Sequence, residues 1–187
     1  MMLARWVSIV GHPFVMVAAL VWVAGLRVGS SAGAVRAVGL ITALVLVPLG
    51  LLMVRQVRTG RWTNVDASRV SDRPALFTVA LAALGAVGAL AYATGSASFL
   101  VRGVVAAGGL MLLSAAVTPW VKASLHMAFA GLAGTSLALL GSGAGYGILA
   151  LLPLLAWSRL ALARHRPLEL IIGLGLGACA GAALVTL

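Results

Sequence analysis

The strongest constraint on the fold is a succession of apolar stretches, each about as long as a helix that crosses a bilayer. They occupy residues 7–26, 35–54, 75–94, 99–117, 124–140, 145–163 and 168–187. A membrane-spanning helix needs about 20 mainly apolar residues, and polar connectors separate the stretches. We therefore predict an all-α fold: a polytopic transmembrane helical bundle of about six or seven helices, forming a single domain over residues 1–187.

Composition excludes the main soluble alternatives. Hydrophobic residues make up 63% of the chain and charged residues only 9%, whereas a soluble domain carries about 25% charged residues. A soluble enzyme and a disordered tail are therefore excluded, and one cysteine cannot form a disulfide scaffold. The glycine and alanine residues that recur within the apolar stretches are typical of membrane helices whose backbones approach closely.

The polar residues concentrate in three connectors, at residues 55–74, 118–126 and 157–169. Two apolar stretches separate the first connector from the second, and two more separate the second from the third. If every stretch crosses the membrane, all three connectors lie on the same face. We therefore expect any polar chemistry at one end of the bundle.

The net charge of +10 comes from 13 basic residues against three acidic ones. In a soluble protein such a balance would suggest nucleic acid as a partner. Here most basic residues lie beside apolar stretches, where they set the orientation of the chain and contact anionic lipid headgroups. We expect membrane lipids, and not nucleic acid, as partners.

The distribution of the basic residues predicts which face is cytoplasmic. Four cations that are candidates for the site are left out of the count: Arg69, Arg73, Lys122 and Arg159. Six others lie on the polar face: Arg5, Arg55, Arg58, Arg61, Arg164 and Arg166. Only three lie opposite: Arg27, Arg36 and Arg102. The positive-inside rule then makes the polar face cytoplasmic, and the compact, Ala-, Gly- and Arg-rich chain favours a bacterial inner membrane.

The third connector brings a histidine and a carboxylate into reach of each other. Pro167 has no backbone donor and disfavours helix in the residue before it, so we expect the chain to break near Arg166. A new helix then begins at Pro167. Glu169 would lie in its first turn, where the carboxylate can orient the ring of His165.

The second connector supplies another imidazole. Ser124 is a good helix N-cap, which leaves His126 in the first turn of the following helix. The first amides of a helix favour anions, and Lys122 adds a positive charge beside them. Arg69 and Arg73 of the long connector are bidentate donors suited to phosphate oxygens.

These residue types together point to phosphoryl transfer. Cations and amides would hold the phosphate, one histidine would attack phosphorus, and the other would protonate the leaving oxygen. The whole chain has three acidic residues, too few for clusters that bind magnesium, so we expect no metal and no other cofactor.

Three segments resemble the type-2 phosphatidic acid phosphatase superfamily of membrane lipid phosphatases. "SRLALARH" at 158–165 fits the S-R-x5-H core of its third motif. "ASLH" at 123–126 resembles its second motif, P-S-G-H, and "RVSDRP" at 69–74 resembles the end of its first motif, K-x6-R-P. The resemblance covers about residues 66–173 and implies a helical bundle that forms a phosphohistidine without a metal.

The resemblance also implies roles for individual residues. His165 would be the nucleophile, Glu169 its orienting carboxylate and His126 the general acid. The implied phosphate-binding residues are Arg73, Arg159 and Ser124. The family's third motif ends in Asp where this chain has Glu169. The lysine position of the first motif falls on Asp66, so Arg69 or Lys122 would supply that charge.

Structural interpretations of the same residues stay open. His165 and Arg159 could be charges at the end of a helix, and His126 could be an interfacial histidine without a role. For His12, which precedes Pro13 within the first apolar stretch, we favour a helix kink with a satisfied imidazole.

Other functions also stay open. One is an inactive or weakly active member of the same family that binds lipids. Another is a membrane prenyltransferase-like enzyme, although such enzymes need two acidic clusters for magnesium diphosphate. A transporter has no support from an internal repeat. The function that the sequence favours is an enzyme that removes phosphate from a lipid phosphate.

Overall fold

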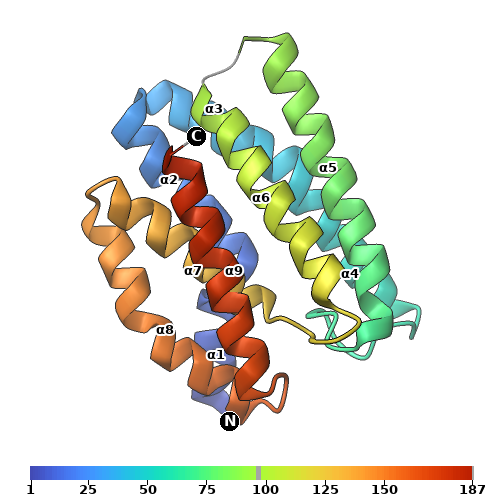
Figure 1. The fold of residues 1–187 in the computed structure, drawn as a ribbon. Helices are drawn as coiled ribbons and strands as arrows, with labels where there is room; N and C mark the ends of the chain where they lie inside the picture. Colours follow the sequence, from blue (N-terminus) through green and yellow to red (C-terminus); the bar gives the residue numbers. More distant parts are fainter. Residues whose placement is uncertain (96–97, 187) are drawn as a thin grey trace.

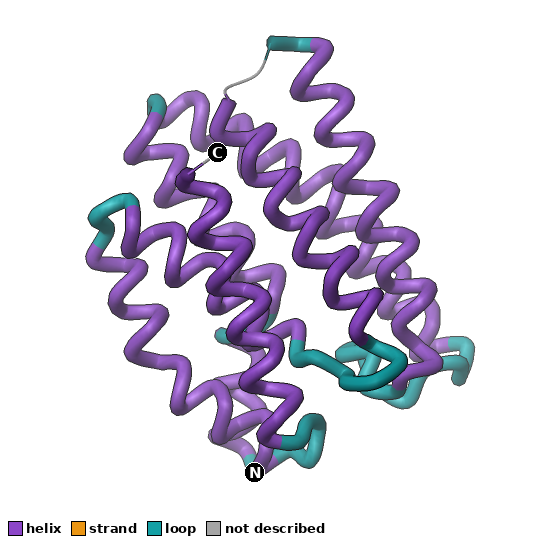
Figure 2. The backbone as a smooth tube through the Cα atoms, in the orientation of Figure 1, coloured by secondary structure: helices purple, strands orange, loops and turns teal. Residues whose placement is uncertain are grey.

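The regular elements of the protein are helices throughout the part of the chain that the structure describes (Figures 1 and 2). The structure is a computed structural model and describes residues 1–95 and 98–186. The α-helices are α1 (Met2–Val10), α2 (Pro13–Val28), α3 (Ser31–Ile41), α4 (Val47–Arg58), α5 (Arg73–Ala93), α6 (Ser98–Val117), α7 (Leu125–Leu139), α8 (Gly143–Ala161) and α9 (Pro167–Thr186). A π-helical turn, η1 (Thr42–Leu46), joins α3 to α4, and a 3-10 turn, η2 (Val70–Asp72), precedes α5.

Six helical segments of the described chain are long and apolar enough to cross a membrane. They are α1 with α2, α3 with η1 and α4, η2 with α5, α6, α8 and α9. Together with the shorter apolar helix α7, they form a polytopic bundle. This result confirms the predicted fold class and the predicted number of helices.

Helix α7 is short because the chain enters the bundle before the helix begins. Its 15 residues extend about 22 Å, less than the hydrocarbon core of about 30 Å. Residues 121–124, which precede it, are not helical, and Figure 1 shows this segment running inward from the polar end to the start of α7. Non-helical backbone at this depth needs partners within the protein, and the Ser124 amide donates to the Glu169 carbonyl at 2.9 Å.

A row of glycines on α9 sets the distance between α9 and α7. A Cβ atom on Gly173 would lie 2.5 Å from the Ser124 carbonyl oxygen. A Cβ on Gly177 would collide with the carbonyl of Ala128, and one on Gly181 would lie 2.7 Å from that of Leu132. Close backbone approach of this kind is the use that small residues have in membrane bundles. It holds the starts of α7 and α9 against each other.

The first membrane segment breaks at His12, as its Pro13 predicted. α1 ends at Val10 and α2 begins at Pro13. His12 has extended backbone angles and caps α2, because its Nδ1 accepts the Phe14 amide hydrogen at 3.2 Å. The interpretation of His12 as a kink with a partnered imidazole is confirmed.

The three polar junctions meet at one end of the bundle, the lower end in Figures 1 and 2. Lys122, between α6 and α7, ties them together. Its Nζ donates to the carbonyl of Ser68 in the α4–α5 connector at 3.0 Å and to that of Arg164 between α8 and α9 at 2.9 Å. The predicted gathering of polar connectors is therefore confirmed.

Candidate active site

His165 and Glu169 form a close pair across the junction between α8 and α9. Ala163 adopts a left-handed conformation with φ 53° and turns the chain after α8, and α9 begins at Pro167. The break near Arg166 is thus confirmed. The Nδ1 atom of His165 lies 2.7 Å from Oε2 of Glu169, and the same oxygen accepts the Arg166 amide hydrogen at 3.3 Å. Because the carboxylate engages Nδ1, Nε2 is the nitrogen left for attack on a substrate.

The surroundings of His165 favour its neutral form. Burial lowers the pKa of His165 to about 4, against the hydrogen bond to Glu169, which acts in the opposite direction. The positive charges of Arg159, Lys122 and Arg73 lower this pKa further, in that order. The same interactions place all three cations around His165. At neutral pH the ring therefore carries the lone pair that a nucleophile needs.

Lys122 contacts the same carboxylate oxygen of Glu169 as His165 does. Its Nζ is 3.7 Å from Oε2 of Glu169. Burial lowers the pKa of Lys122, while the charge of Glu169 raises it and that of Arg73 lowers it. With two backbone carbonyls and one carboxylate as partners, Lys122 holds the junctions together as well as adding positive charge.

Arg159, near the end of α8, is fully enclosed at the centre of the site. The residue is 1% exposed. Its Nη2 forms an ion pair with Oδ2 of Asp66 at 3.0 Å, and its Nη1 donates to the Ser8 hydroxyl. Asp66 comes from the long connector and Ser8 from α1, so Arg159 joins three distant parts of the chain.

Several buried donors in the site make no hydrogen bond within the described part of the chain. They are Nε and Nη1 of Arg73, Nε of Arg159 and the hydroxyl of Ser124. These residues are 2%, 1% and 0% exposed, respectively. Buried polar groups are nearly always hydrogen-bonded, and an unpaired buried charge is strongly unfavourable. Isolated atoms of Arg102, Ser114 and Arg164 also lack partners, but only Arg73, Arg159 and Ser124 are residues predicted to bind phosphate.

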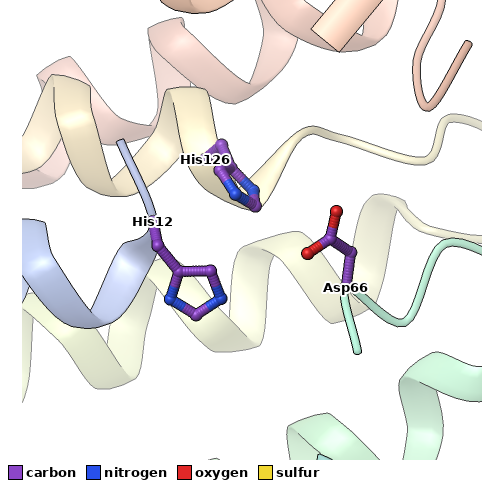
Figure 3. Close-up of side chains that lie close together, drawn as sticks. All are labelled: His12, Asp66 and His126. Carbon is purple, nitrogen blue, oxygen red and sulfur yellow. The ribbon is translucent and has the colours of Figure 1, made fainter. Parts of the chain in front are cut away.

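His126 lies deep in the same region, in the first turn of α7. It is 4% exposed, and its Nε2 is 3.5 Å from the hydroxyl of Ser8. Ser124 is the N-cap residue of α7, as predicted, although its hydroxyl makes no capping hydrogen bond. His12 packs edge-on against His126, with ring centroids 5.2 Å apart and an interplanar angle of 90°. Figure 3 shows both rings on one side of the Asp66 carboxylate.

His12, Asp66 and His126 are the one set of three metal-ligating side chains that meet within residues 1–95 and 98–186. One ligand atom from each lies within 4.8 Å of the others. A tetrahedral zinc site needs separations of about 3.3 Å, since each ligand is about 2.0 Å from the metal. One Asp66 oxygen already pairs with Arg159, and Nδ1 of His12 accepts a backbone hydrogen. The adjacent guanidinium favours an anion over a metal cation in this position.

The structure brings together seven of the eight predicted site residues: His165, Glu169, His126, Ser124, Arg73, Arg159 and Lys122. Arg69 differs. It is exposed, and its backbone amide donates to Asp72 at 3.3 Å in the turn that precedes α5. Of the two cations considered for the missing lysine charge, Lys122 is therefore the one in contact with the site.

The places of three residues in the site were not predicted from the sequence: Ser8, Asp66 as the partner of Arg159, and His12 as the neighbour of His126. The signals for two of them were visible. His12 is a histidine before a proline inside an apolar stretch, and Asp66 is one of only three acidic residues. Ser8 carried no signal, because a serine in a membrane helix is common.

Comparison of the chain with models of protein families, with curated proteins and with solved structures found no match. The interpretation of the site therefore depends on its chemistry and on the motif resemblance.

Proposed function

We propose that this protein is a phosphoric monoester hydrolase, a metal-independent membrane phosphatase that removes phosphate from a lipid phosphate through a phosphohistidine intermediate. The observation that carries the proposal is the group of buried donors without partners on Arg73, Arg159 and Ser124, beside a neutral histidine that a carboxylate orients. A phosphate has the charge and the number of acceptor oxygens to satisfy these donors.

The reaction follows from the positions of these groups. Arg73, Arg159 and the Ser124 hydroxyl hold the phosphate oxygens, and Nε2 of His165 forms a bond to phosphorus. The bond from phosphorus to the ester oxygen breaks, and this oxygen takes its electron pair and a proton from His126. His126 then takes a proton from water as the water oxygen attacks phosphorus. The bond from phosphorus to Nε2 breaks with its electron pair on nitrogen, which releases phosphate and restores both histidines.

Glu169 acts through His165. Its carboxylate at 2.7 Å from Nδ1 keeps the proton on that nitrogen and stabilises the ring while it bears positive charge. The side chain is one methylene longer than the aspartate of the related motif, but α9 begins at Pro167 and places it within hydrogen-bonding distance.

An apolar cavity beside the site favours a lipid substrate over a soluble one. Pro13 and Phe14, which follow His12, line it at the polar side together with Leu125, which precedes His126. Phe99 and Leu100 line it toward the opposite end of the bundle. Its walls come from α2, α3, η1, α4, α5, α6, α7 and α9. A hydrocarbon chain in this cavity would leave the phosphate at the polar end.

Phosphate release in the presence of EDTA tests the proposed chemistry. Purified protein in lipid nanodiscs is given phosphatidic acid, phosphatidylglycerol phosphate, and polyprenyl phosphate and diphosphate, each with and without EDTA. We expect release from at least one of them, unchanged by EDTA. Release only with added magnesium would overturn the metal-independent mechanism. No release from any of these lipids would overturn the proposed function and favour a lipid-binding protein.

A substitution that fills the cavity tests whether the hydrocarbon chain of a lipid substrate binds there. Ala107 lines the cavity about midway along α6, and we expect Ala107→Phe to lower kcat/KM for long-chain phosphates about tenfold. Short-chain phosphates should be hydrolysed at an unchanged rate. Leu112→Phe, at a position on the same helix whose side chain is exposed, is the matched control. Equal effects on long and short chains would show that the chain binds elsewhere.

The distribution of arginines supports a proposal for the membrane face on which the site lies. We place the site at the cytoplasmic face of a bacterial inner membrane, because the basic residues outside the site are concentrated at the polar end.

A further inference from the structure

We propose that His12 is a further substrate-contacting residue, a neutral hydrogen-bond donor to the oxygen that leaves phosphorus. The proposal rests on the proposed phosphatase activity and adds to it a residue outside the three motifs. It follows from the tautomer of the ring, from its position beside His126 and from its place at the end of the apolar cavity.

The backbone of α2 determines which nitrogen of His12 carries the proton. The Phe14 amide donates to Nδ1 at 3.2 Å, so Nδ1 must present a lone pair. The proton of the neutral ring then lies on Nε2. Protonation of Nδ1 would break this hydrogen bond and place two donors against each other. A neutral imidazole held at a helix N-terminus in this way is an effective hydrogen-bond donor to developing negative charge.

The Nε2 edge of His12 faces the polar site. Figure 3 shows the ring turned toward Asp66, below His126, and one ligand atom of each residue lies within 4.8 Å of the others. The ring faces the Asp66 carboxylate, and Arg159 donates to this carboxylate at 3.0 Å. The Nε2 edge of His12 and the guanidinium of Arg159 therefore both lie near one anion, and a phosphate ester at this place would meet the same two donors.

His12 lies on the side of the site where the leaving group is expected. Its ring contacts His126, with centroids 5.2 Å apart, and His126 is the proposed donor of the proton to the leaving oxygen. The next two residues, Pro13 and Phe14, line the apolar cavity proposed for the hydrocarbon chain. The ester oxygen, which joins that chain to phosphorus, would lie between these groups.

The role of His12 in the step involves no proton transfer. The lone pair of His165 Nε2 forms the bond to phosphorus, the bond to the ester oxygen breaks with its electron pair on oxygen, and His126 supplies the proton. His12 keeps its own proton throughout and donates a hydrogen bond to the oxygen while its negative charge is largest.

His12→Asn tests this role without removing the helix cap. Asparagine is among the best N-cap residues, so its side-chain oxygen replaces Nδ1 as acceptor for the Phe14 amide, whereas its side chain is too short to replace the Nε2 donor. The matched control is Ser30→Ala. It removes the side-chain acceptor that caps α3 at the opposite end, where Ser30 accepts the Gly33 amide hydrogen at 3.1 Å, and leaves the site intact.

The measurements are kcat and KM for an alkyl phosphate lipid and for an aryl phosphate whose leaving oxygen needs little stabilisation. For His12→Asn we expect kcat for the alkyl substrate to fall about 100-fold, with KM nearly unchanged and a much smaller fall for the aryl substrate. The loss should be the same at about pH 6 and about pH 8, because the hydrogen bond from the Phe14 amide to Nδ1 holds the ring in its neutral form. Ser30→Ala should match the wild type for both substrates.

Three results would overturn the proposal. Unchanged kcat in His12→Asn would mean that the ring contacts no reacting atom, and equal losses for both substrates would mean that it acts elsewhere than at the leaving oxygen. A loss that depends on pH would mean that His12 transfers a proton. An inactive wild type would overturn the proposed function itself, and nitrogen NMR of His12, compared with His12→Asn, would still show whether the proton lies on Nε2.

Discussion

The chain reverses direction at both ends of the bundle, but the connections between the helices differ at the two ends. At one end, α2 and α3 are joined through Gly29 and Ser30, and α7 and α8 through residues 140–142, where Gly141 has φ 70°. Within the described residues, the hydrogen bonds of these turns are local, such as that from the Gly33 amide to the hydroxyl of Ser30. At the polar end, Lys122 and Arg159 join segments that are far apart in the sequence.

The simple turns at the first end show what the helical bundle requires by itself. A turn with a glycine in the left-handed region or a capping serine is enough to reverse the chain. The polar end adds buried cations, which are unfavourable in an apolar environment unless they are paired. Because reversal of the chain does not require them, their presence indicates a function for that end.

Glu169→Gln should have the largest effect. The amide can donate to Nδ1 of His165 and so place the ring proton on Nε2, which then cannot attack phosphorus. We expect kcat to fall about 10³- to 10⁴-fold, whereas Glu169→Asp, which keeps the carboxylate, should retain most of the activity. Ser30→Ala at the opposite end should change nothing. A fully active Glu169→Gln variant would separate Glu169 from the chemistry.

Arg73→Met should reduce activity and stabilise the protein. The guanidinium of Arg73 is buried with two nitrogens unpartnered, and replacing such a charge by an apolar side chain is worth about 1–4 kcal/mol in stability. We expect a higher Tm in nanodiscs together with weaker phosphate binding. Arg36→Met at the exposed, opposite end should alter neither. A lower Tm with unchanged activity would mean that Arg73 is structural.

His165 should titrate well below an ordinary histidine. Burial and three neighbouring cations lower its pKa from 6.5 to about 4, so the folded state binds fewer protons than the unfolded state over this range. The stabilising contribution is therefore full above pH 6.5 and is lost progressively as the pH falls toward about 4. Nitrogen NMR of the His165 ring, assigned with His165→Asn, measures the midpoint. A midpoint at or above 6.5 would contradict the lowering of the His165 pKa by burial and the neighbouring cations.

Local features of the site could be predicted from the sequence, because short spacing determines them. His165 and Glu169 are four residues apart around a proline that begins a helix. The proline places Glu169 in the first turn of that helix, from which its carboxylate reaches back to the residues just before it. The same holds for Ser124 as the N-cap of α7. The prediction that small residues allow close packing was also confirmed, but its location was not predictable: Gly177 lies against the backbone of α7, whereas Gly175 on the same helix has open space around it.

Long-range contacts could not be predicted, because they depend on how whole helices are placed. The Asp66–Arg159 ion pair joins residues 93 positions apart, and the Ser8–Arg159 hydrogen bond joins residues 151 positions apart. Neither spacing has a periodicity that a sequence could reveal. The position of His12 beside His126 depends likewise on the depth at which α7 begins, which the length of its apolar stretch does not indicate.

Trapping of the phosphorylated enzyme tests whether His165 forms a phosphohistidine. The protein is mixed with a radiolabelled lipid phosphate that it hydrolyses and denatured within one turnover, and the label bound to protein is counted, with His165→Asn and His126→Asn as comparisons. We predict acid-labile label on the wild type, less label on His126→Asn, which lacks the acid that protonates the leaving oxygen, and none on His165→Asn. Label that persists in His165→Asn, or hydrolysis by the wild type without any bound label, would contradict a phosphohistidine at this position.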